Sequence, residues 1–378
     1  MIPRSIFEPE HEAFRNTAAA FLEKEAVPYH QQWEKNGLVD REIWNKAGET
    51  GLLCFAMPEE FGGVDADFRF NAVLIEEVAK RGLSGLGFGV HSDICAPYIL
   101  HNGSATLKEK YLPKMVTGEK IAAIAMTEPG TGSDLQGVRT TAILDGDEYV
   151  LNGSKTFITN GQHCDLVIVV CKTDPNEGAK GISLIVVDAD SAGFSKGRNL
   201  EKIGLKAQDT SELFFDNVRV PKENLLGQEG MGFIYLMQEL PQERLSIGVG
   251  ALAAAEAVFE HTKTYVNERK AFGKPVAAFQ NTRFKLAEMS TSITVGRTFV
   301  DRCIELHVAG KLDAVTASKL KYWSTDMQCS LTDECLQLHG GYGYMWEYPV
   351  ARAWADSRIQ RIYGGTNEIM KEIIARSL

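Results

Sequence analysis

The sequence predicts an α+β multidomain protein in which a small β domain lies between two helical domains. Three observations predict it. Apolar residues recur at helical spacing up to about residue 118, short runs rich in β-branched and aromatic residues follow, and long helical stretches fill the remainder. With 378 residues, 44% of them hydrophobic, the chain can bury a large core in two or three structural units.

The first domain, residues 1–118, is predicted to be all-helical. Segments such as FRNTAAAFLEKEAVPYHQQW and RFNAVLIEEVAKRG carry their apolar residues at helical spacing, and strand-like runs are missing. The glycine-rich stretch GLSGLGFGV, residues 82–90, follows a helix rather than a strand. We therefore interpret it as a close-packed helix junction and not as a dinucleotide-binding loop.

The second domain, residues 119–226, is predicted to be a β domain. Gly, Asp, Asn and Pro separate its strand-like runs, and no helix of ~10–15 residues fits between them. Parallel βαβ crossovers are therefore excluded, and a sandwich or barrel is favoured. The third domain, residues 227–378, is helical again. Its long apolar stripe between Ala277 and His307 suits a helix bundle that forms oligomers.

Composition argues against several classes of protein. The 50 acidic and 40 basic residues are interleaved and give a net charge of −10, so nucleic acid is not expected as a partner. No apolar run approaches the ~18 residues of a membrane span, and the acidic start is unlike a secretory signal or a transit peptide. We expect a soluble protein of a bacterial cytoplasm or a mitochondrial matrix. Seven scattered cysteines and eight dispersed histidines predict reduced thiols and no metal site.

Several short segments are candidates for a binding site. AMTEPGTGSD (residues 125–134) and SKTFITNG (154–161) place hydroxyl groups around glycines that let a ligand approach the backbone, although ordinary β-turns share this composition. In the third domain, the glycine pairs of QLHGGYGY and IYGGTNEI are positions where the backbone can meet a bulky ligand. Arg269 in ERKAFGK could bind a pyrophosphate or complement a helix C-terminus.

Taken together, the motifs MTEPGTGSD, FITNG, ERKAFGK, QLHGGYGY and IYGGTNEI resemble those of the acyl-CoA dehydrogenase family, in that order and over essentially the whole chain. The resemblance implies an N-terminal helical domain, a central β-barrel and a C-terminal four-helix bundle, assembled as a homotetramer that is a dimer of dimers. It also implies that FAD lies between the β domain and the bundle, with part of its site supplied by a neighbouring subunit.

Matched position by position, the resemblance implies which residues bind the cofactor and the substrate. Those of the cofactor site are Met126, Thr127, Ser133, Phe157, Ile158, Thr159, Arg269, Phe272, Gln280, Gln337, Leu338, His339, Gly340, Gly341, Thr366, Asn367 and Glu368. The residues from Arg269 to Gly341 would come from the neighbouring subunit, and a Trp is more usual at Phe157. Ser133, Arg244, Gly364 and Gly365 match positions at the acyl-CoA.

The sequence departs from most of the family at the catalytic base. That base is usually a Glu at the position of Gly364, and a glycine cannot accept a proton. Among long-chain and isovaleryl-CoA dehydrogenases the base lies on an earlier helix, and Glu243 in PQERL matches it. We therefore predict Glu243 as the catalytic residue. Without a side chain at Gly364, we expect room for this carboxylate to arrive from the other helix.

The implied activity is the FAD-dependent α,β-dehydrogenation of fatty acyl-CoA to trans-2-enoyl-CoA in fatty acid β-oxidation, closest to the long-chain type. An electron-transfer flavoprotein would accept the electrons. Three alternatives stay open at this point: an acyl-CoA oxidase or related flavin oxidase that uses O2, a branched short-chain dehydrogenase of the isovaleryl type, and a non-catalytic flavoprotein relative. The sequence does not fix the length or branching of the acyl chain.

Overall fold

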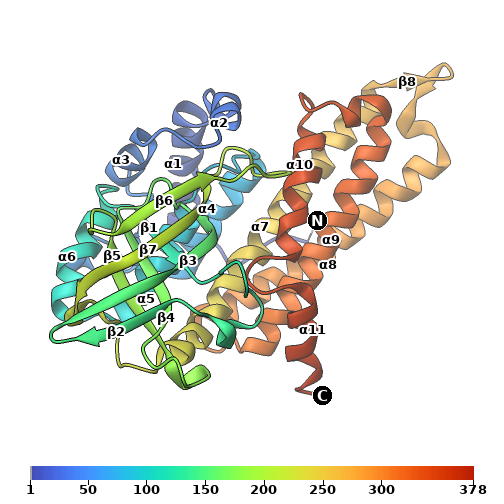
Figure 1. Ribbon diagram of the computed structural model, residues 1–378. Helices are drawn as coiled ribbons and strands as arrows, with labels where there is room; N and C mark the ends of the chain where they lie inside the picture. Colours follow the sequence, from blue (N-terminus) through green and yellow to red (C-terminus); the bar gives the residue numbers. More distant parts are fainter. Residues whose placement is uncertain (1) are drawn as a thin grey trace.

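Helices make up the first part of the chain in the computed structural model, which describes residues 2–378 (Figure 1). Residue 1 of the predicted first domain lies outside this range. Asp67 accepts a hydrogen bond from the backbone N–H of Arg69 and caps α4, and Ser104 caps α6 in the same way. The α-helices of this part are α1 (Pro9–Glu25), α2 (His30–Asn36), α3 (Glu42–Glu49), α4 (Phe68–Lys80), α5 (Ala96–Asn102) and α6 (Ala105–Val116).

A six-residue π-helix, η2 (Val90–Cys95), leads directly into α5. It follows the glycine-rich stretch, which packs as closely as predicted. A Cβ atom on Gly87 would overlap the side-chain oxygen of Asn160, and the Asn160 amide donates a hydrogen bond of 3.1 Å to the Gly87 carbonyl. This junction fixes the helical part against the β domain. Short π-helices often occur at functional sites.

The middle of the chain forms one curled sheet with the strand order β1–β4–β2–β3–β7–β6 and with β5 paired to β4 (Figure 1). As expected, no α-helix lies between these strands in the part of the chain that the structure describes. Two pairings are nevertheless parallel, β1 with β4 and β2 with β4, and the β2–β3 hairpin takes the place of a crossover helix between β1 and β4. The strands are β1 (Ala122–Ala125), β2 (Thr141–Asp145), β3 (Glu148–Thr159), β4 (Leu166–Lys172), β5 (Ile182–Asp188), β6 (Phe194–Asn199) and β7 (Thr210–Pro221).

Strand β4 is an unbroken apolar run because both of its faces are covered. Its even-numbered residues from Leu166 to Val170 pack with side chains of α5 and α6, whereas the odd-numbered residues from Val167 to Cys171 pack among the other strands. Side chains alternate between the faces of a sheet, so one strand serves two hydrophobic cores. The sheet is thereby held on the N-terminal helices.

The last part of the chain is a bundle of long helices that extends away from the sheet (Figure 1). Its longest member, α7, packs Leu245 and Val249 against Phe68 and Ala72 of α4. Where the sequence indicated only a turn between two helices, the chain forms a short hairpin, which lies at the far tip of the bundle. The elements are α7 (Gly232–Glu268), β8 (Lys270–Ala271), β9 (Lys274–Pro275), α8 (Gln280–Val308), α9 (Ala314–His339), α10 (Pro349–Ser357) and α11 (Asn367–Ala375).

Two expectations from composition can be compared with the structure. Within residues 2–378, no helix has both the length and the apolar character that a membrane crossing requires. In the same part of the chain all seven cysteines are free thiols, and all but Cys329 are buried, in agreement with the prediction of reduced core thiols.

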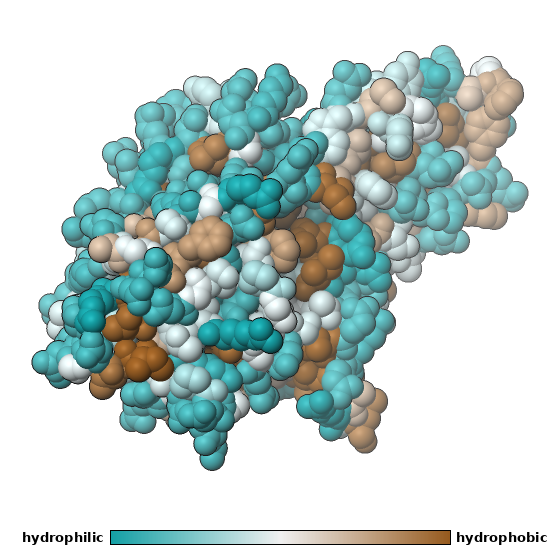
Figure 2. Space-filling view, in the orientation of Figure 1, coloured by the Kyte–Doolittle hydropathy of each residue, from teal (hydrophilic) through white to brown (hydrophobic). Residues whose placement is uncertain are grey.

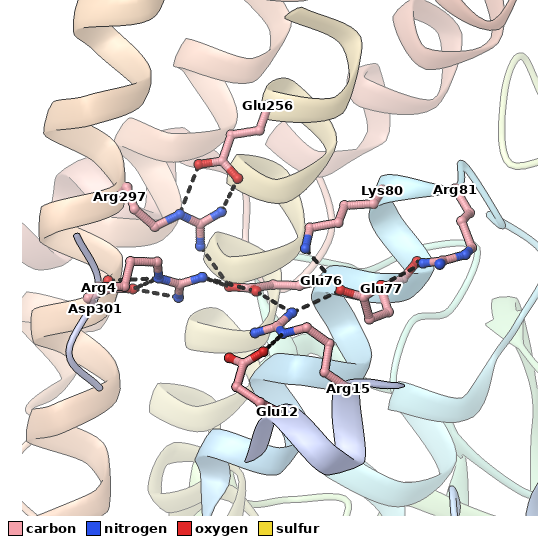
Figure 3. A network of polar contacts seen from close by, with 10 residues as sticks. All are labelled: Arg4, Glu12, Arg15, Glu76, Glu77, Lys80, Arg81, Glu256, Arg297 and Asp301. Carbon is pink, nitrogen blue, oxygen red and sulfur yellow. Dashed lines mark hydrogen bonds and ion pairs between the residues drawn. The ribbon is translucent and has the colours of Figure 1, made fainter. Parts of the chain in front are cut away.

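An ion cluster joins the N-terminal helices to the bundle (Figure 3). Glu76 of α4 is fully buried, and its carboxylate lies 2.7 Å from Arg297 of α8, 2.8 Å from Arg4 and 3.1 Å from Arg15 of α1. Arg297 also pairs with Glu256 of α7. Burial alone would raise the pKa of Glu76, but the charges of Arg297, Arg4 and Arg15 outweigh it and hold the pKa below its ordinary value. The stabilisation is therefore present at neutral pH and is lost as acid protonates the carboxylate.

We expect Glu76→Gln to destabilise the protein, because it leaves the buried Arg297 guanidinium without one of its two carboxylates. Breaking a buried ion pair costs about 3 kcal/mol, or roughly 4 °C in thermal midpoint for a chain of this length. Calorimetry measures the change. Glu305→Gln is the control, since its pair with Arg302 is exposed and should be worth less than about 1 kcal/mol. Equal midpoints for the two variants would contradict a stabilising role of the cluster.

Candidate active site

The carboxyl group of Glu243 is buried between α7 and α5. Only 6% of the residue is exposed, and its Oε1 accepts a hydrogen bond of 3.0 Å from the Tyr98 hydroxyl. Burial raises the pKa of Glu243 to about 7; the Tyr98 hydrogen bond and the charge of Arg244 oppose this effect, and Glu239 adds to it. A carboxylate in such a place exchanges protons near neutral pH, as a general base must.

Arg244 is also buried, on the side of α7 that faces the glycine pair. Its Nη1 donates to Ser318 Oγ at 3.3 Å, and its Nη2 lies 3.8 Å from where a Cβ atom on Gly365 would be. Its Nε is buried without a hydrogen-bond partner in residues 2–378. The structure thus brings together two residues that the resemblance placed at the acyl-CoA, and one of them has an unused donor.

The glycine pair forms a left-handed turn before α11. Gly364 has φ 63° and Gly365 has φ 88°, values that residues with a side chain rarely adopt. Lys321 of α9 is fully buried and fixes the turn, since its Nζ donates to the Gly365 carbonyl at 2.8 Å and to Asn367 Oδ1 at 2.9 Å. Burial, together with the charge of Arg244, lowers the pKa of Lys321 to about 8.

The expected open space at Gly364 is partly occupied. A Cβ atom on Gly364 would overlap Cδ1 of Ile247, which lies one turn beyond Glu243 on α7. Ile247 therefore takes part of the space beside the Gly364 backbone, and the expectation that the missing side chain leaves room for the Glu243 carboxylate stays a prediction. Residues four positions apart lie on one face of a helix, so Glu243 and Ile247 share the face of α7 that is nearest this turn.

The predicted cofactor residues of the β domain lie at one edge of the sheet, which is formed by the C-terminal end of β3 and the loop that follows β1. Met126 and Thr127 are half-buried, Ser133 is exposed, and Ile158 and Thr159 lie at the end of β3. A buried pair supports this edge, because Lys155 Nζ donates to the Met126 carbonyl at 2.9 Å and to Glu128 Oε1 at 2.8 Å.

At the start of α11, the three predicted residues differ in what they can offer. Thr366 caps the helix, and Glu368 is exposed. The Asn367 side chain points inward to Lys321, Thr325 and Asp326, so only its backbone is left for a cofactor.

The remaining predicted cofactor residues lie at the other end of the bundle. Arg269, Gln337, Leu338, His339, Gly340 and Gly341 line a hollow of about 580 Å³ at the C-terminal end of α9. Phe272, in the exposed hairpin, and Gln280, at the start of α8, lie in the neighbouring segments. Figure 1 places this tip far from the sheet, so one chain does not bring the two groups together.

The residues present fit FAD in both places. Phe157 is 67% exposed and is held at φ 61°, so a strained backbone presents an aromatic ring where an apolar flavin ring could stack. Apolar side chains also gather along the seam between the sheet and the bundle (Figure 2). In the distant hollow, a Cβ atom on Gly340 or Gly341 would meet nothing within 4 Å, and the buried Nε2 of His339 has no partner in the described residues. Arg269 supplies a positive charge there.

Comparison with known families decides the assignment. Models of the acyl-CoA dehydrogenase N-terminal, middle and C-terminal domains match residues 8–119, 123–218 and 230–378. The chain belongs to the acyl-CoA dehydrogenase family. Membership confirms the predicted fold and the predicted enzyme class, an oxidoreductase that acts on a CH–CH bond, and it supports FAD as the cofactor.

Individual relatives are similar over nearly the whole chain. The mitochondrial long-chain specific acyl-CoA dehydrogenase of Mus musculus is 54% identical over 99% of this chain and 88% of its own length. The crystal structure of an acyl-CoA dehydrogenase from Geobacillus kaustophilus has a TM-score of 0.98 at 54% identity and covers 99% of both chains. An acyl-CoA dehydrogenase from Bacillus anthracis, described as complexed with FAD, has a TM-score of 0.92 at 35% identity over 98% of this chain and 67% of its own.

Sequence reasoning missed three residues of the site. Tyr98 lies within the apolar run CAPYIL, where an aromatic residue is usually core filling. Ile247 is one of many aliphatic residues on α7. Lys321 left the clearest signal. The residues three and four positions away on the same helix face are small or apolar, namely Ala317, Ser318, Ser324 and Thr325, and a lysine buried among them needs a partner.

We expect Lys155→Met to weaken the edge of the sheet that carries Met126. The change leaves the buried carboxylate of Glu128 without its counter-ion, at a cost of roughly 3 kcal/mol. The variant should therefore melt lower and lose FAD more readily, which the ratio of flavin to protein absorbance after gel filtration measures. Lys222→Met removes an exposed ion pair with Asp147 and is the control. A Lys155→Met protein that keeps its FAD as the control does would exclude this supporting role.

Proposed function

We propose that the protein oxidises long-chain fatty acyl-CoA thioesters to trans-2-enoyl-CoA, with FAD as the cofactor and Glu243 as the catalytic base. One observation carries the proposal. Glu243 is a buried carboxylate with a pKa of about 7 and lies on the same helix as Arg244 and Ile247, which contact the turn where the base of most relatives would be. No carboxylate is available at Gly364 itself.

The chain's own residues hold the substrate and move one proton. Glu243 takes the proton from the α-carbon at a carboxylate oxygen, and burial makes it a stronger base than a solvated carboxylate. The guanidinium of Arg244 and the backbone N–H groups of the Gly364–Gly365 turn bind the thioester end and polarise its carbonyl, which stabilises negative charge as the proton leaves. FAD, when bound, would accept the hydrogen of the β-carbon together with its electron pair, while the electron pair of the α C–H bond forms the new double bond.

The preference for long chains rests on similarity. The relative from Mus musculus that is 54% identical is named as long-chain specific. A base on the earlier helix also occurs in the isovaleryl branch, so a branched short acyl group is the alternative. A ladder of straight and branched acyl-CoA thioesters, compared by kcat/KM, separates the two.

The division of the cofactor residues supports an assembly of at least two subunits, and the family resemblance implies a homotetramer built as a dimer of dimers. The hollow at the end of α9 lies far from the edge of the sheet within one folded subunit, so a neighbouring subunit would have to complete each FAD site. Phe284 and Val295 of α8, 57% and 56% exposed, are apolar side chains that such an assembly would cover. The family resemblance assigns the electrons to an electron-transfer flavoprotein. The compartment, a bacterial cytoplasm or a mitochondrial matrix, stays a prediction.

We expect Glu243→Gln to keep its FAD and to lose roughly 10²- to 10⁴-fold in kcat, because general-base catalysis is removed. Anaerobic mixing with palmitoyl-CoA measures it, since flavin bleaching reports the step in which the substrate is oxidised. In the wild type this rate should rise with pH through about 7 and level off above it, because the base acts when it is deprotonated. Glu260→Gln, an exposed position of the same helix, is the control.

The same experiment separates the alternative functions. Bleached flavin that air reoxidises within the turnover time would indicate an oxidase, and absence of bleaching with every acyl-CoA would indicate a non-catalytic relative. Wild-type kcat in Glu243→Gln would exclude Glu243 as the base.

We expect that moving the catalytic glutamate from position 243 to position 364 requires three substitutions, at positions 243, 364 and 247. In the variant Glu243→Gly with Gly364→Glu, the new side chain meets Ile247 and the left-handed backbone costs about 1 kcal/mol. Adding Ile247→Ala clears the space, so the triple variant should regain more kcat than the double variant, and neither should reach the wild type. A double variant as active as the triple would show that Ile247 does not restrict this position.

A further inference from the structure

We propose that Tyr98 is a positioning residue for the catalytic base: its hydroxyl holds Oε1 of Glu243, and Oε2 is therefore the oxygen that takes the α-proton of the substrate. The inference rests on the proposed function, since it takes Glu243 as the base. It adds a second residue to the proton transfer and assigns the reaction to one of the two oxygens.

The contact is direct and fully enclosed. The Tyr98 hydroxyl donates to Oε1 of Glu243 at 3.0 Å, and no other hydrogen bond of this hydroxyl is found within residues 2–378. Tyr98 is completely buried, so water does not compete for the hydroxyl. Burial and the nearby charge of Glu243 raise the pKa of Tyr98 well above its ordinary value. The hydroxyl therefore stays protonated and acts as a donor.

The backbone around Tyr98 leaves its ring little freedom. Pro97 precedes it in the first turn of α5, and Cys95, Ala96 and Ile99 are also completely buried. The π-helix before α5 is fastened to α7 by Gln242, whose Nε2 donates to the Asp93 carbonyl at 2.7 Å. Gln242 is the residue before Glu243. Two neighbouring residues of α7 thus contact the η2–α5 segment, which fixes the hydroxyl against the carboxyl group.

Tyr98 differs from the other groups that face Glu243. These are the Cys95 thiol of η2 and, on α7 itself, Glu239 and Arg244. None of them hydrogen-bonds the carboxyl group in the described residues, whereas Tyr98 does. A donor on a carboxylate favours its charged form and opposes the effect of burial. Tyr98 therefore keeps part of the base ionised at neutral pH in a place where burial alone would neutralise it.

The Tyr98 hydrogen bond also determines which oxygen of Glu243 accepts the proton. Before the reaction, Oε1 accepts from Tyr98, and Oε2 is the oxygen with its lone pairs free for the substrate. During the reaction, the C–H bond at the α-carbon breaks and an O–H bond forms at Oε2, while Tyr98 keeps its own proton. The electron pair of the α C–H bond forms the α,β double bond as the C–H bond at the β-carbon breaks, and FAD, when bound, would accept the β-hydrogen together with its electron pair.

Tyr98→Phe tests the inference, because it removes one oxygen atom and keeps the ring in the core. The flavin-bleaching rate with palmitoyl-CoA is measured under anaerobic conditions as a function of pH. We expect the midpoint to move up by about one to two pH units, as for the loss of one hydrogen bond to a charged group. At pH 7 the rate should fall roughly 5- to 50-fold and should recover at higher pH, with a smaller effect on KM.

The matched control is Tyr111→Phe. Tyr111 is also completely buried, and its hydroxyl donates to Asp188 Oδ2 at 3.0 Å. The control loses the same kind of bond in the same core, away from Glu243. Its pH profile should equal that of the wild type even if its thermal midpoint falls.

A second variant protects the test against a folding defect in Tyr98→Phe. 3-Fluorotyrosine introduced at position 98 is a stronger acid and hence a stronger donor, so the midpoint should move down. A midpoint that stays at the wild-type pH in both Tyr98 variants would overturn the role of Tyr98 and leave Glu243 as the base. Wild-type turnover in Glu243→Gln would instead overturn the proposed function, so the two failures are distinguishable.

Discussion

The structure depends on holding one carboxyl group out of water while it remains able to ionise. Burial of Glu243 favours the neutral acid, and the Tyr98 hydrogen bond favours the carboxylate. The balance of these two effects sets a pKa near 7. A solvated glutamate would be too weak a base, and a buried glutamate without a donor would stay protonated. In the proposed mechanism, the chemistry thus rests on a contact between residues that lie 145 positions apart in the sequence.

The contact requires that α5 and α7 keep their relative position, although they belong to different parts of the chain. Three features maintain it. Leu245 and Val249 of α7 pack on α4, Gln242 binds the carbonyl of Asp93 in the π-helix, and the Glu76 cluster ties α4 to α7 and α8. The buried carboxylate of Glu76 and that of Glu243 illustrate opposite outcomes of burial. Three arginines lower the pKa of the first, and the second has one neutral donor and keeps a raised pKa.

Periodicity and composition predicted the order of helical, β and helical parts, because burial of one helix face or of both sheet faces leaves a repeating pattern in the sequence. Motifs predicted that Arg244, Gly364 and Gly365 belong to one site, and the structure places these residues together. Tyr98 could not be predicted, because its neighbours make it look like core filling. The parallel pairing of β1 with β4 and the β8–β9 hairpin were not predicted either, because they depend on how distant or very short segments pair in the fold.

Position 364 shows what a sequence can and cannot reveal about a site. The sequence shows that Gly364 has no side chain, but it does not show which side chains lie next to this glycine in the fold. The sequence shows an absent base and a substitute on another helix, and from these alone it is natural to place the substitute in the open space. The structure shows in addition that Ile247, one helical turn from Glu243, reaches the space next to the Gly364 backbone. A close-packed interior does not leave a side-chain volume empty beside a reacting centre. In the proposed mechanism, Glu243 accepts the proton and Ile247 occupies space next to Gly364 that a side chain at position 364 would need. Moving the base to position 364 would therefore involve positions 243, 247 and 364 together.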